Sequence, residues 1–490
     1  MSSENIYNAD PNNTDVNNIK KKLPFRIKAG YSVGQVGEAL GISLYAMFFM
    51  FFLTDVVGIP AGVAGTISLI ITLCDTLASP IIGNISDNLH SKKGRRRPMM
   101  IGILIPYSVC MFLLLNNIDM NSPMIVYVYF GLIGILFCVA YRIYAIPFYA
   151  LGAELTDDFD ERTSLRVWAS TLSFLAIMLA SAAPPMIVEM AKQAGGTEST
   201  GWRVVGGSFG IIIAAAIIIC WLATRGGELV SKEAYAVEGK QNLVKNMIRD
   251  IGGVIKLKPI WMLAGSVIGW IIACSLIGSG LMYLMANALN YSAGLQSTGF
   301  MINSLAGIIW LPIINWAAGK FDKKKVYALS FLVTSIALIL FYFIGFTHLA
   351  LFIVFLVLYN FANSCYWTLT YAMYYDISEL DEFKNGKRRE GTIASLMAFA
   401  EGIGTAIGMW LIGQILEFGN YDGMAATQTE SAIDAIYAIN TWVPGLFGLF
   451  ALICALAYPI SRSRFNALVK ALQLKRDGKK YTTDGFEKLL

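Results

Sequence analysis

Charged residues and histidines are scarce in this 490-residue chain. Only 14% of the residues are Asp, Glu, Lys or Arg, and two are His, whereas 56% are hydrophobic. Soluble globular domains carry about 25% charged residues, so the composition excludes an ordinary soluble protein. The two histidines, His90 and His348, lie in loops far apart in the sequence. Enzyme chemistry that depends on histidine therefore has no support, and we expect the chain not to be an enzyme.

Paired cysteines and a nucleotide-binding loop are also missing. None of the seven cysteines forms a C-x-x-C pair, so a disulfide framework and a zinc site both lack the required spacing. We interpret the cysteines as small apolar packing residues. No G-x-x-x-x-G-K-S/T run occurs, so an ion gradient rather than ATP is the expected energy source. The sequence predicts no cofactor and no metal centre.

Long apolar runs are abundant. Twelve of them approach or exceed the roughly 20 residues that a helix needs to cross about 30 Å of hydrocarbon. They are expected at 30–53, 60–86, 98–116, 123–153, 164–191, 203–224, 259–287, 293–318, 326–345, 349–376, 392–417 and 441–462. The predicted fold class is an all-α membrane protein with twelve transmembrane helices.

The basic residues predict the orientation of these helices. Lys and Arg cluster in alternate loops and in both tails, whereas the opposite loops carry only Lys192 and Arg203. Cytoplasmic loops retain basic residues, so both termini are expected in the cytoplasm, with a bacterial inner membrane as the default location. Basic loops that face anionic membrane lipids also account for the formal charge of +5 without any nucleic-acid partner.

The chain contains an internal repeat. The fourth and the tenth apolar runs are each followed by an acidic segment and then a basic one, at 154–163 and 376–392. Two six-helix halves joined by a basic linker match the parallel-repeat plan of major-facilitator transporters. We expect a monomer with the following parts: a tail at 1–24, a bundle at 25–225, a linker at 226–258, a bundle at 259–462 and a tail at 463–490.

Four ionisable residues lie inside the apolar runs: Glu38, Asp75, Arg142 and Glu401. A charge at this depth costs about 3 kcal/mol or more, so it usually faces a polar cavity or a partner. Counting about 1.5 Å per residue places Asp75 and Arg142 both about 18 Å from the cytoplasmic edge, where they could meet. The alternatives are a purely structural ion pair and, for the two glutamates, bonds to a neighbouring Ser or backbone group.

Trp367 differs from most of the aromatic residues because it lies deep within an apolar run. Its neighbours Asn360, Asn363, Ser364 and Thr368 are polar. An aromatic ring with amides around it suits a sugar, whose CH face stacks while its hydroxyls form hydrogen bonds. The alternative is core packing, with the polar groups joining helices.

Four motifs stand out along the chain: Thr-Asp-Val-Val-Gly at 54–58, the run from Asp75 to Asp87 with Gly-Arg-Arg-Arg-Pro at 94–98, Ile-Pro-Phe-Tyr at 146–149, and 367–376 followed by Arg-Arg-Glu-Gly at 388–391. Together they resemble the glycoside–pentoside–hexuronide cation symporter family, the melibiose-permease-like carriers of the major facilitator superfamily. The resemblance extends from about residue 24 to about residue 460 and implies transport of a sugar with a cation by alternating access.

The resemblance assigns roles to single residues and also shows departures. Asp75 matches the carboxylate that holds the coupling cation, and Tyr149 and Trp367 match two positions that contact the sugar. Arg142 stands where a threonine completes the family's sodium site, and Ser79 replaces a second carboxylate. Protons are therefore favoured over sodium as the coupling ion. Three charged sugar-binding positions of the family are occupied by Ala39, Ala145 and Gly402.

The sequence thus predicts three groups of functional residues. Candidates for sugar binding are Glu38, Arg142, Tyr149, Asn363, Trp367 and Glu401, and candidates for cation coupling are Asp75 and Arg142. A cytoplasmic gate between the halves is expected at Asp87, Arg166, Asp376 and Arg389, although these charges are also typical of ordinary solvated loops. The alternative functions are a lipid or amphiphile carrier or flippase on the same scaffold, and a membrane sugar sensor that transports nothing.

Overall fold

A computed structural model describes residues 23–89, 96–118, 122–156, 158–226, 249, 251–425 and 427–489. Within these residues all regular structure is helical. Eleven of the described helices are long and apolar enough to cross a membrane, and Leu104–Leu114 is apolar but shorter. The chain is therefore a multi-pass membrane protein, which confirms the predicted fold class.

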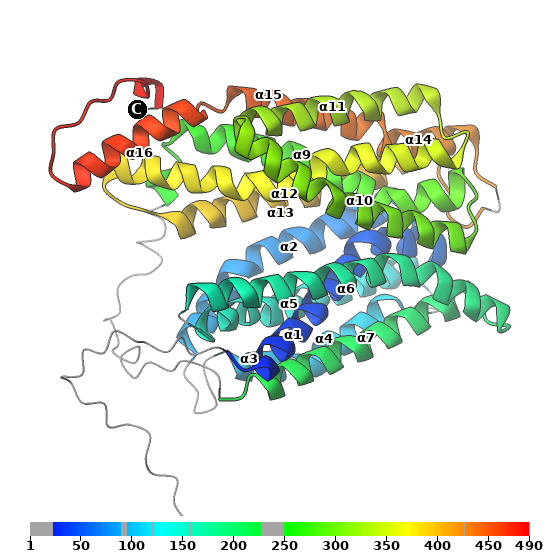
Figure 1. Cartoon of the computed structure of the whole chain (residues 1–490). Helices are drawn as coiled ribbons and strands as arrows, with labels where there is room; N and C mark the ends of the chain where they lie inside the picture. The colour runs from blue at the N-terminus through cyan, green and yellow to red at the C-terminus, as the bar shows by residue number, and fades with distance from the viewer. Residues whose placement is uncertain are drawn as a thin grey trace, which may run out of the picture.

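The helices form two groups that lie side by side in Figure 1. The N-terminal bundle contains α1 (Phe25–Phe51) with the π-helical turn η1 (Phe52–Val56), α2 (Ala61–Asn88), α3 (Arg97–Gly102), α4 (Leu104–Leu114), α5 (Pro123–Glu154), α6 (Phe159–Gln193) and α7 (Glu198–Ala223). The C-terminal bundle contains α9 (Lys258–Tyr283) with the π-helical turn η3 (Leu284–Ala288), α10 (Ala293–Lys320), α11 (Lys323–Ile344), α12 (Leu349–Asn385), α13 (Glu390–Phe418), α14 (Glu430–Asn440) and α15 (Trp442–Ala457).

The third predicted span is interrupted. It consists of the short helix α3 and the helix α4, which are separated at Ile103. Pro106 is the third residue of α4, and because proline has no N–H, it cannot donate to the carbonyl of Gly102. The local helix therefore breaks, which explains why α4 alone is short.

The last span differs from the prediction of 441–462. It runs from Glu430 to Ala457 and is broken at Thr441, between α14 and α15. Pro444 cannot donate to the carbonyl of Asn440, so the helical hydrogen bonding is interrupted there. The Asn440 side chain donates to the carbonyl of Gly280 in α9, at 3.0 Å. The sequence places the start of this span too late because 430–440 contains Glu, Asp and Asn.

The predicted C-terminal tail contains a further helix, α16 (Arg462–Arg476). Its buried residues Leu468 and Leu472 give it an apolar face, and Figure 1 shows α16 beside one end of α12. At the end of α16, Arg476 pairs with Glu382 of α12 through two hydrogen bonds. The tail is therefore packed against the C-terminal bundle.

The two bundles touch closely at one end and separate toward the other. We call the end of the molecule that carries Arg389 and the other basic loop residues the basic end. Far from it, α2 and α13 meet so tightly that a Cβ atom at Gly65 would lie 2.9 Å from the Cα of Gly413. Gly402 also faces α2 directly. About five turns along α2 and six along α13, Gly83 and Gly391 have nothing within 4 Å of their Cβ positions. The helices therefore diverge toward the basic end.

Candidate functional site

Asp75 of α2 and Arg142 of α5 form a bidentate ion pair in the middle of their helices. Arg142 donates from Nε to Oδ1 at 2.7 Å and from Nη2 to Oδ2 at 2.6 Å. The Asp75 side chain is 10% exposed and that of Arg142 is 32% exposed. The guanidinium also lies over the ring of Tyr141, 5.3 Å from its centroid. The sequence-based expectation that the two residues meet is confirmed.

Glu38 of α1 is buried beside this pair and is held by two polar side chains. The Tyr141 hydroxyl donates to Oε1 at 2.7 Å, and Gln35, one turn before Glu38, donates to Oε2. Gln35 also reaches the Tyr149 hydroxyl, at 3.1 Å. From the sequence, a neighbouring Ser or backbone group was the alternative partner for Glu38. In the structure its partners are Tyr141 and Gln35. Tyr149 is thereby connected to Glu38 through one side chain.

Glu401 of α13 interacts electrostatically with the same arginine from the other bundle. Its Oε1 accepts a hydrogen bond from the Tyr366 hydroxyl at 2.8 Å. The positive charge of Arg142 acts on both Glu401 and Glu38. Asp75 therefore bonds the guanidinium directly, and two further carboxylates, from α1 and α13, interact with its charge. Full ionisation of this group leaves an excess of negative charge, which the low-dielectric interior of a membrane protein disfavours.

Trp367 of α12 is 47% exposed. It stacks on Tyr371, one turn further along the same face, with the ring centroids 6.4 Å apart. Tyr371 interacts electrostatically with Glu401 and with Tyr149 of the N-terminal bundle. The face of α12 that carries Trp367 and Tyr371 is therefore directed toward the junction of the bundles, and Tyr149, 38% exposed, lies across that junction.

The polar residues around Trp367 point in different directions. Asn360 donates to Asn303 of α10 at 2.7 Å, and Ser364 donates to the carbonyl of Gly307 at 2.9 Å. These two residues join α12 to α10, which is the role that the alternative to sugar binding predicts for polar groups near Trp367. Asn363 faces α9 instead, where its Oδ1 accepts from the Cys274 thiol at 3.3 Å.

The proposed gate residues at the basic end make contacts within their own bundles. Arg166 lies over the Tyr149 ring, 5.3 Å from its centroid. Asp376 pairs with Lys323 at 2.5 Å, and Arg389 pairs with the fully buried Asp381 at 2.6 Å. The Asp87 side chain lies outside the part of the chain that the structure describes.

A cluster of polar residues joins the bundles at the opposite end, which we call the latch: Thr54, Asp55, Tyr283, Asn287 and Tyr421. Asp55 accepts from the Tyr421 hydroxyl at 2.6 Å and from Asn287 at 2.8 Å, and Thr54 bonds to the Tyr283 hydroxyl at 2.7 Å. Burial, together with the Asp55 carboxylate, raises the pKa of Tyr421 above its usual value, so the hydroxyl stays a donor. Sequence reasoning missed this role, although Thr54 and Asp55 lie in a recognised motif.

Comparison with known proteins gives a consistent family match. A family model described as MFS/sugar transport protein matches residues 30–462. The Escherichia coli glucuronide carrier protein homolog is 25% identical and covers 92% of this chain and 96% of its own. The isoprimeverose transporter of Lactiplantibacillus pentosus is 26% identical and covers 90% of each chain. The E. coli inner membrane symporter YicJ is 25% identical, with 89% and 92% covered.

Solved structures share the fold at low sequence identity. A D-xylose–proton symporter superposes with a TM-score of 0.61 at 13% identity, over 89% of this chain and 97% of that one. A structure from work on substrate recognition in proton-dependent oligopeptide transporters has a TM-score of 0.64 at 13% identity, over 92% and 100%. At this identity the likeness establishes the major-facilitator fold alone.

Proposed function

The chain belongs to the MFS/sugar transport protein family, and from that premise we propose a cation-coupled symporter of a glycoside, small oligosaccharide or uronide. The family membership confirms the resemblance seen in the motifs and makes the chain a transporter rather than an enzyme. The relatives include a glucuronide carrier protein homolog and an isoprimeverose transporter, which supports this substrate class. The mechanism we propose is alternating access between two bundles.

The observation that carries the proposal is the position of Arg142. It pairs with Asp75 of its own bundle, and its charge also acts on Glu401 of the other bundle. A group that bonds to one bundle and interacts electrostatically with the other can couple the occupancy of the site to the movement of the two bundles. Carriers of this plan bind substrate near the midplane, at the junction of their repeats.

Protons are the coupling ion that the geometry favours. Sodium requires several oxygen ligands, whereas both oxygens of Asp75 already accept from the Arg142 guanidinium. When Asp75 takes up a proton, the ion pair loses its charge attraction and Arg142 becomes available to substrate. Release of the proton restores the pair and displaces the substrate from the arginine. Uptake of sugar and of a proton are thereby linked.

The sugar, in this proposal, binds between Trp367 and Tyr149. The two exposed aromatic rings come from opposite bundles, and an aromatic face suits the CH face of a pyranose. Glu38, Glu401 and Arg142 supply hydrogen-bonding groups for hydroxyls or a carboxylate. Asn363 lies one turn before Trp367 and is assigned to the edge of this site.

The described conformation supports an inward-open state. The latch holds the bundles together at one end, and α2 and α13 diverge at the basic end. The positive-inside rule makes the basic end cytoplasmic, which would place both termini in the cytoplasm. Arg166 of the N-terminal bundle then lies on one side of an open gate, and Asp376 and Arg389 of the C-terminal bundle lie on the other. This gate closes when the latch opens. We propose a monomer in a bacterial inner membrane, the membrane of the E. coli inner membrane symporter YicJ to which the chain is similar.

Ligand-dependent thermal stabilisation of the purified protein tests the substrate class. A ligand that binds only the folded form raises the melting temperature, so a panel of neutral mono-, di- and oligosaccharides and matching uronates should give a saturable shift for at least one member. Labelled phospholipid in reconstituted vesicles serves as the comparison. Movement of the lipid, with no shift by any carbohydrate, would support a flippase and contradict the proposal.

A further inference from the structure

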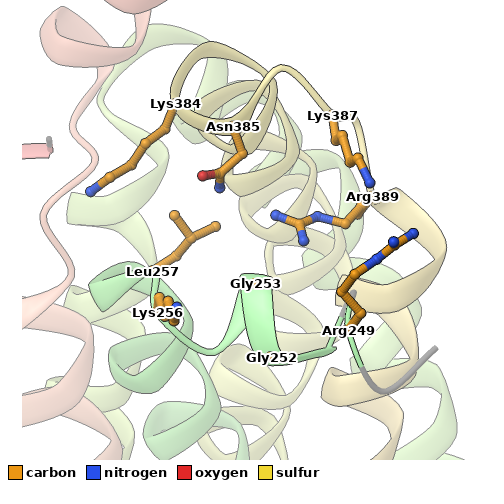
Figure 2. Close-up of a pocket in the computed structure, with 9 residues that line it drawn as sticks. All are labelled: Arg249, Gly252, Gly253, Lys256, Leu257, Lys384, Asn385, Lys387 and Arg389. Carbon is orange, nitrogen blue, oxygen red and sulfur yellow. The ribbon is translucent and has the colours of Figure 1, made fainter. Parts of the chain in front are cut away.

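A cavity lies beside the latch, at the end of the molecule opposite to the basic end. Figure 2 shows part of the basic end, where side chains such as Arg249, Lys387 and Arg389 gather. The cavity beside the latch has a volume of about 340 Å³, within the range of small-molecule sites. Its wall comes from η1, α6 and α7 of the N-terminal bundle and from η3 and α10 of the C-terminal bundle. A ligand inside it therefore touches both bundles.

Acidic side chains outnumber basic ones in the wall of this cavity. Asp55, Glu189 and Glu198 line it, and Lys192 is the single lysine or arginine among the described lining residues. The groups that bond to Asp55 in the latch are all uncharged, and Glu198 acts on Asp55 as a like charge. Like charges repel strongly where water is scarce, so a cation between Asp55 and Glu198 is favoured.

The basic residues at this end do not supply that cation. Lys192 is exposed and, within the described chain, forms no ion pair with a carboxylate. Arg203 does not line the cavity and donates instead to Asn116 at 2.8 Å. The undescribed residues 119–121 and 426 include no lysine or arginine. The negative charge of the wall is therefore available to a ligand.

Other groups in the wall indicate what else this ligand carries. Phe51, Trp202 and Tyr291 contribute aromatic rings, and aromatic faces attract ammonium ions. The Trp202 side chain is 1% exposed, and among the described residues its indole N–H has no hydrogen-bond partner. The hydroxyl of Ser292, the residue before α10, does not cap that helix. A ligand hydroxyl satisfies the buried indole donor, which is unfavourable when left unpaired.

We propose that this cavity binds a hydroxylated amine of the amino-sugar class and thereby holds the two bundles together beside the latch. The ammonium group forms charge-assisted hydrogen bonds with Asp55 and Glu198, and the hydroxyls bond to Trp202 and Ser292. Because the ligand touches both bundles, it binds best when this end is closed and shifts the population toward that state. Binding does not depend on which sugar is transported, whereas the effect on conformation rests on the proposed alternating access.

The test measures binding of D-glucosamine to the purified full chain by calorimetric titration. D-Glucose, which has a hydroxyl in place of the ammonium group, is the matched probe. We expect glucosamine to bind about tenfold more tightly than glucose, the scale of one charge-assisted hydrogen bond. Bound glucosamine should also raise the alkylation rate of a Gly83→Cys reporter in a cysteine-free background, because closure beside the latch accompanies opening at the basic end.

Variants distinguish this cavity from the site around Arg142. Glu198→Gln should weaken glucosamine binding about tenfold. Glu430→Gln is the matched control, because Glu430 also lies in the first turn of its helix after a capping threonine but does not line the cavity. Trp367→Ala alters only the proposed sugar site and should leave glucosamine binding unchanged.

Four results would overturn the proposal: no binding of glucosamine, binding no tighter than that of glucose, equal affinities in Glu198→Gln and Glu430→Gln, or loss of binding in Trp367→Ala. Binding that leaves the alkylation rate unchanged would contradict the role in holding the bundles together. Absence of carbohydrate-dependent stabilisation across the neutral sugars and uronates counts against the proposed transport function and not against this cavity.

Discussion

At the scale of single residues, the account depends on whether the Asp75 carboxylate cycles a proton. Asp75→Asn keeps the shape of the side chain but cannot take up and release a proton. We expect it to abolish accumulation of sugar against a gradient while exchange of labelled sugar across the membrane continues. Uphill uptake and exchange, measured in parallel in proteoliposomes, check this. Undiminished accumulation by the variant would eliminate Asp75 as the coupling group.

Substitution of Arg142 distinguishes two roles for this arginine: pairing with Asp75 and binding a carboxylate of the substrate. If it serves Asp75, as the two hydrogen bonds support, Arg142→Gln leaves an unpaired carboxylate that binds protons more readily. The pH profile of uptake should then move to higher pH for neutral sugars and uronides alike. The measurement is uptake of one neutral sugar and its uronate across a pH series. A uronide preference that disappears in the variant, with an unchanged pH profile, would assign Arg142 to the substrate.

Trp367 tests the stacking contact. Trp367→Ala should weaken sugar binding by about 1–3 kcal/mol, the scale of losing a large aromatic contact in a binding site, and Trp367→Phe should be milder. Titration of the thermal shift with sugar measures this affinity. Trp316 is an exposed tryptophan on α10, and Trp316→Ala provides the matched control. Unchanged affinity with a lower melting temperature of the free protein would make Trp367 a packing residue.

The sequence was informative about intramembrane charges but not about their neutral partners. Asp75 and Arg142 could be matched from their equal depth because helical rise is regular. Tyr141, Gln35 and Tyr366, which hold the two glutamates, carried no signal, because the direction in which a side chain points about a helix axis depends on packing. The bonds that Asn360 and Ser364 of α12 make to α10 likewise depend on how the two helices lie relative to one another, which the sequence does not give.

At the scale of elements, the latch connects η1 to η3 and to the segment after α13. Tyr421→Phe removes the hydroxyl that donates to Asp55 at 2.6 Å, a bond to a charged group worth about 1.5–3 kcal/mol. We expect the inward-open state to lose population by about tenfold or more relative to the outward-open state. The alkylation rate of a Gly83→Cys reporter in a cysteine-free background measures this, because Gly83 faces open space.

A matched control for the latch is Tyr437→Phe, a half-buried tyrosine of α14 that stacks on Phe346. It removes the same hydroxyl from a ring outside the latch and should leave the alkylation rate unchanged. Equal rates in Tyr421→Phe and the parent protein would show that the latch does not hold the bundles together.

Element boundaries were harder to predict than element types. Eleven spans followed from length and hydropathy, but the last one begins at Glu430 rather than at 441. Its first part includes Asn440, whose side chain bonds to the backbone of α9, a partner that is distant in the sequence. The helix α16 was missed for a related reason, since its apolar face is narrow and the helix packs against α12, which is distant in the sequence.

At the scale of the whole molecule, the two bundles form a transporter of the MFS/sugar transport protein family in which one end is joined and the other is parted. The repeat and the fold were readable from sequence because membrane insertion imposes long apolar helices and a charge bias on the loops. The conformational state was not readable, since both states use the same helices and differ only in contacts between bundles.

The most direct measurement of the central claim is sugar uptake into proteoliposomes under an imposed gradient of protons or of sodium. The sugar is the one that stabilises the purified protein, and each gradient is applied alone at fixed membrane potential. Proton-coupled symport predicts accumulation above equilibrium when protons enter with the sugar, loss of accumulation with a protonophore, and no accumulation in Asp75→Asn. Accumulation driven by sodium alone, with no response to the proton gradient, would contradict the account.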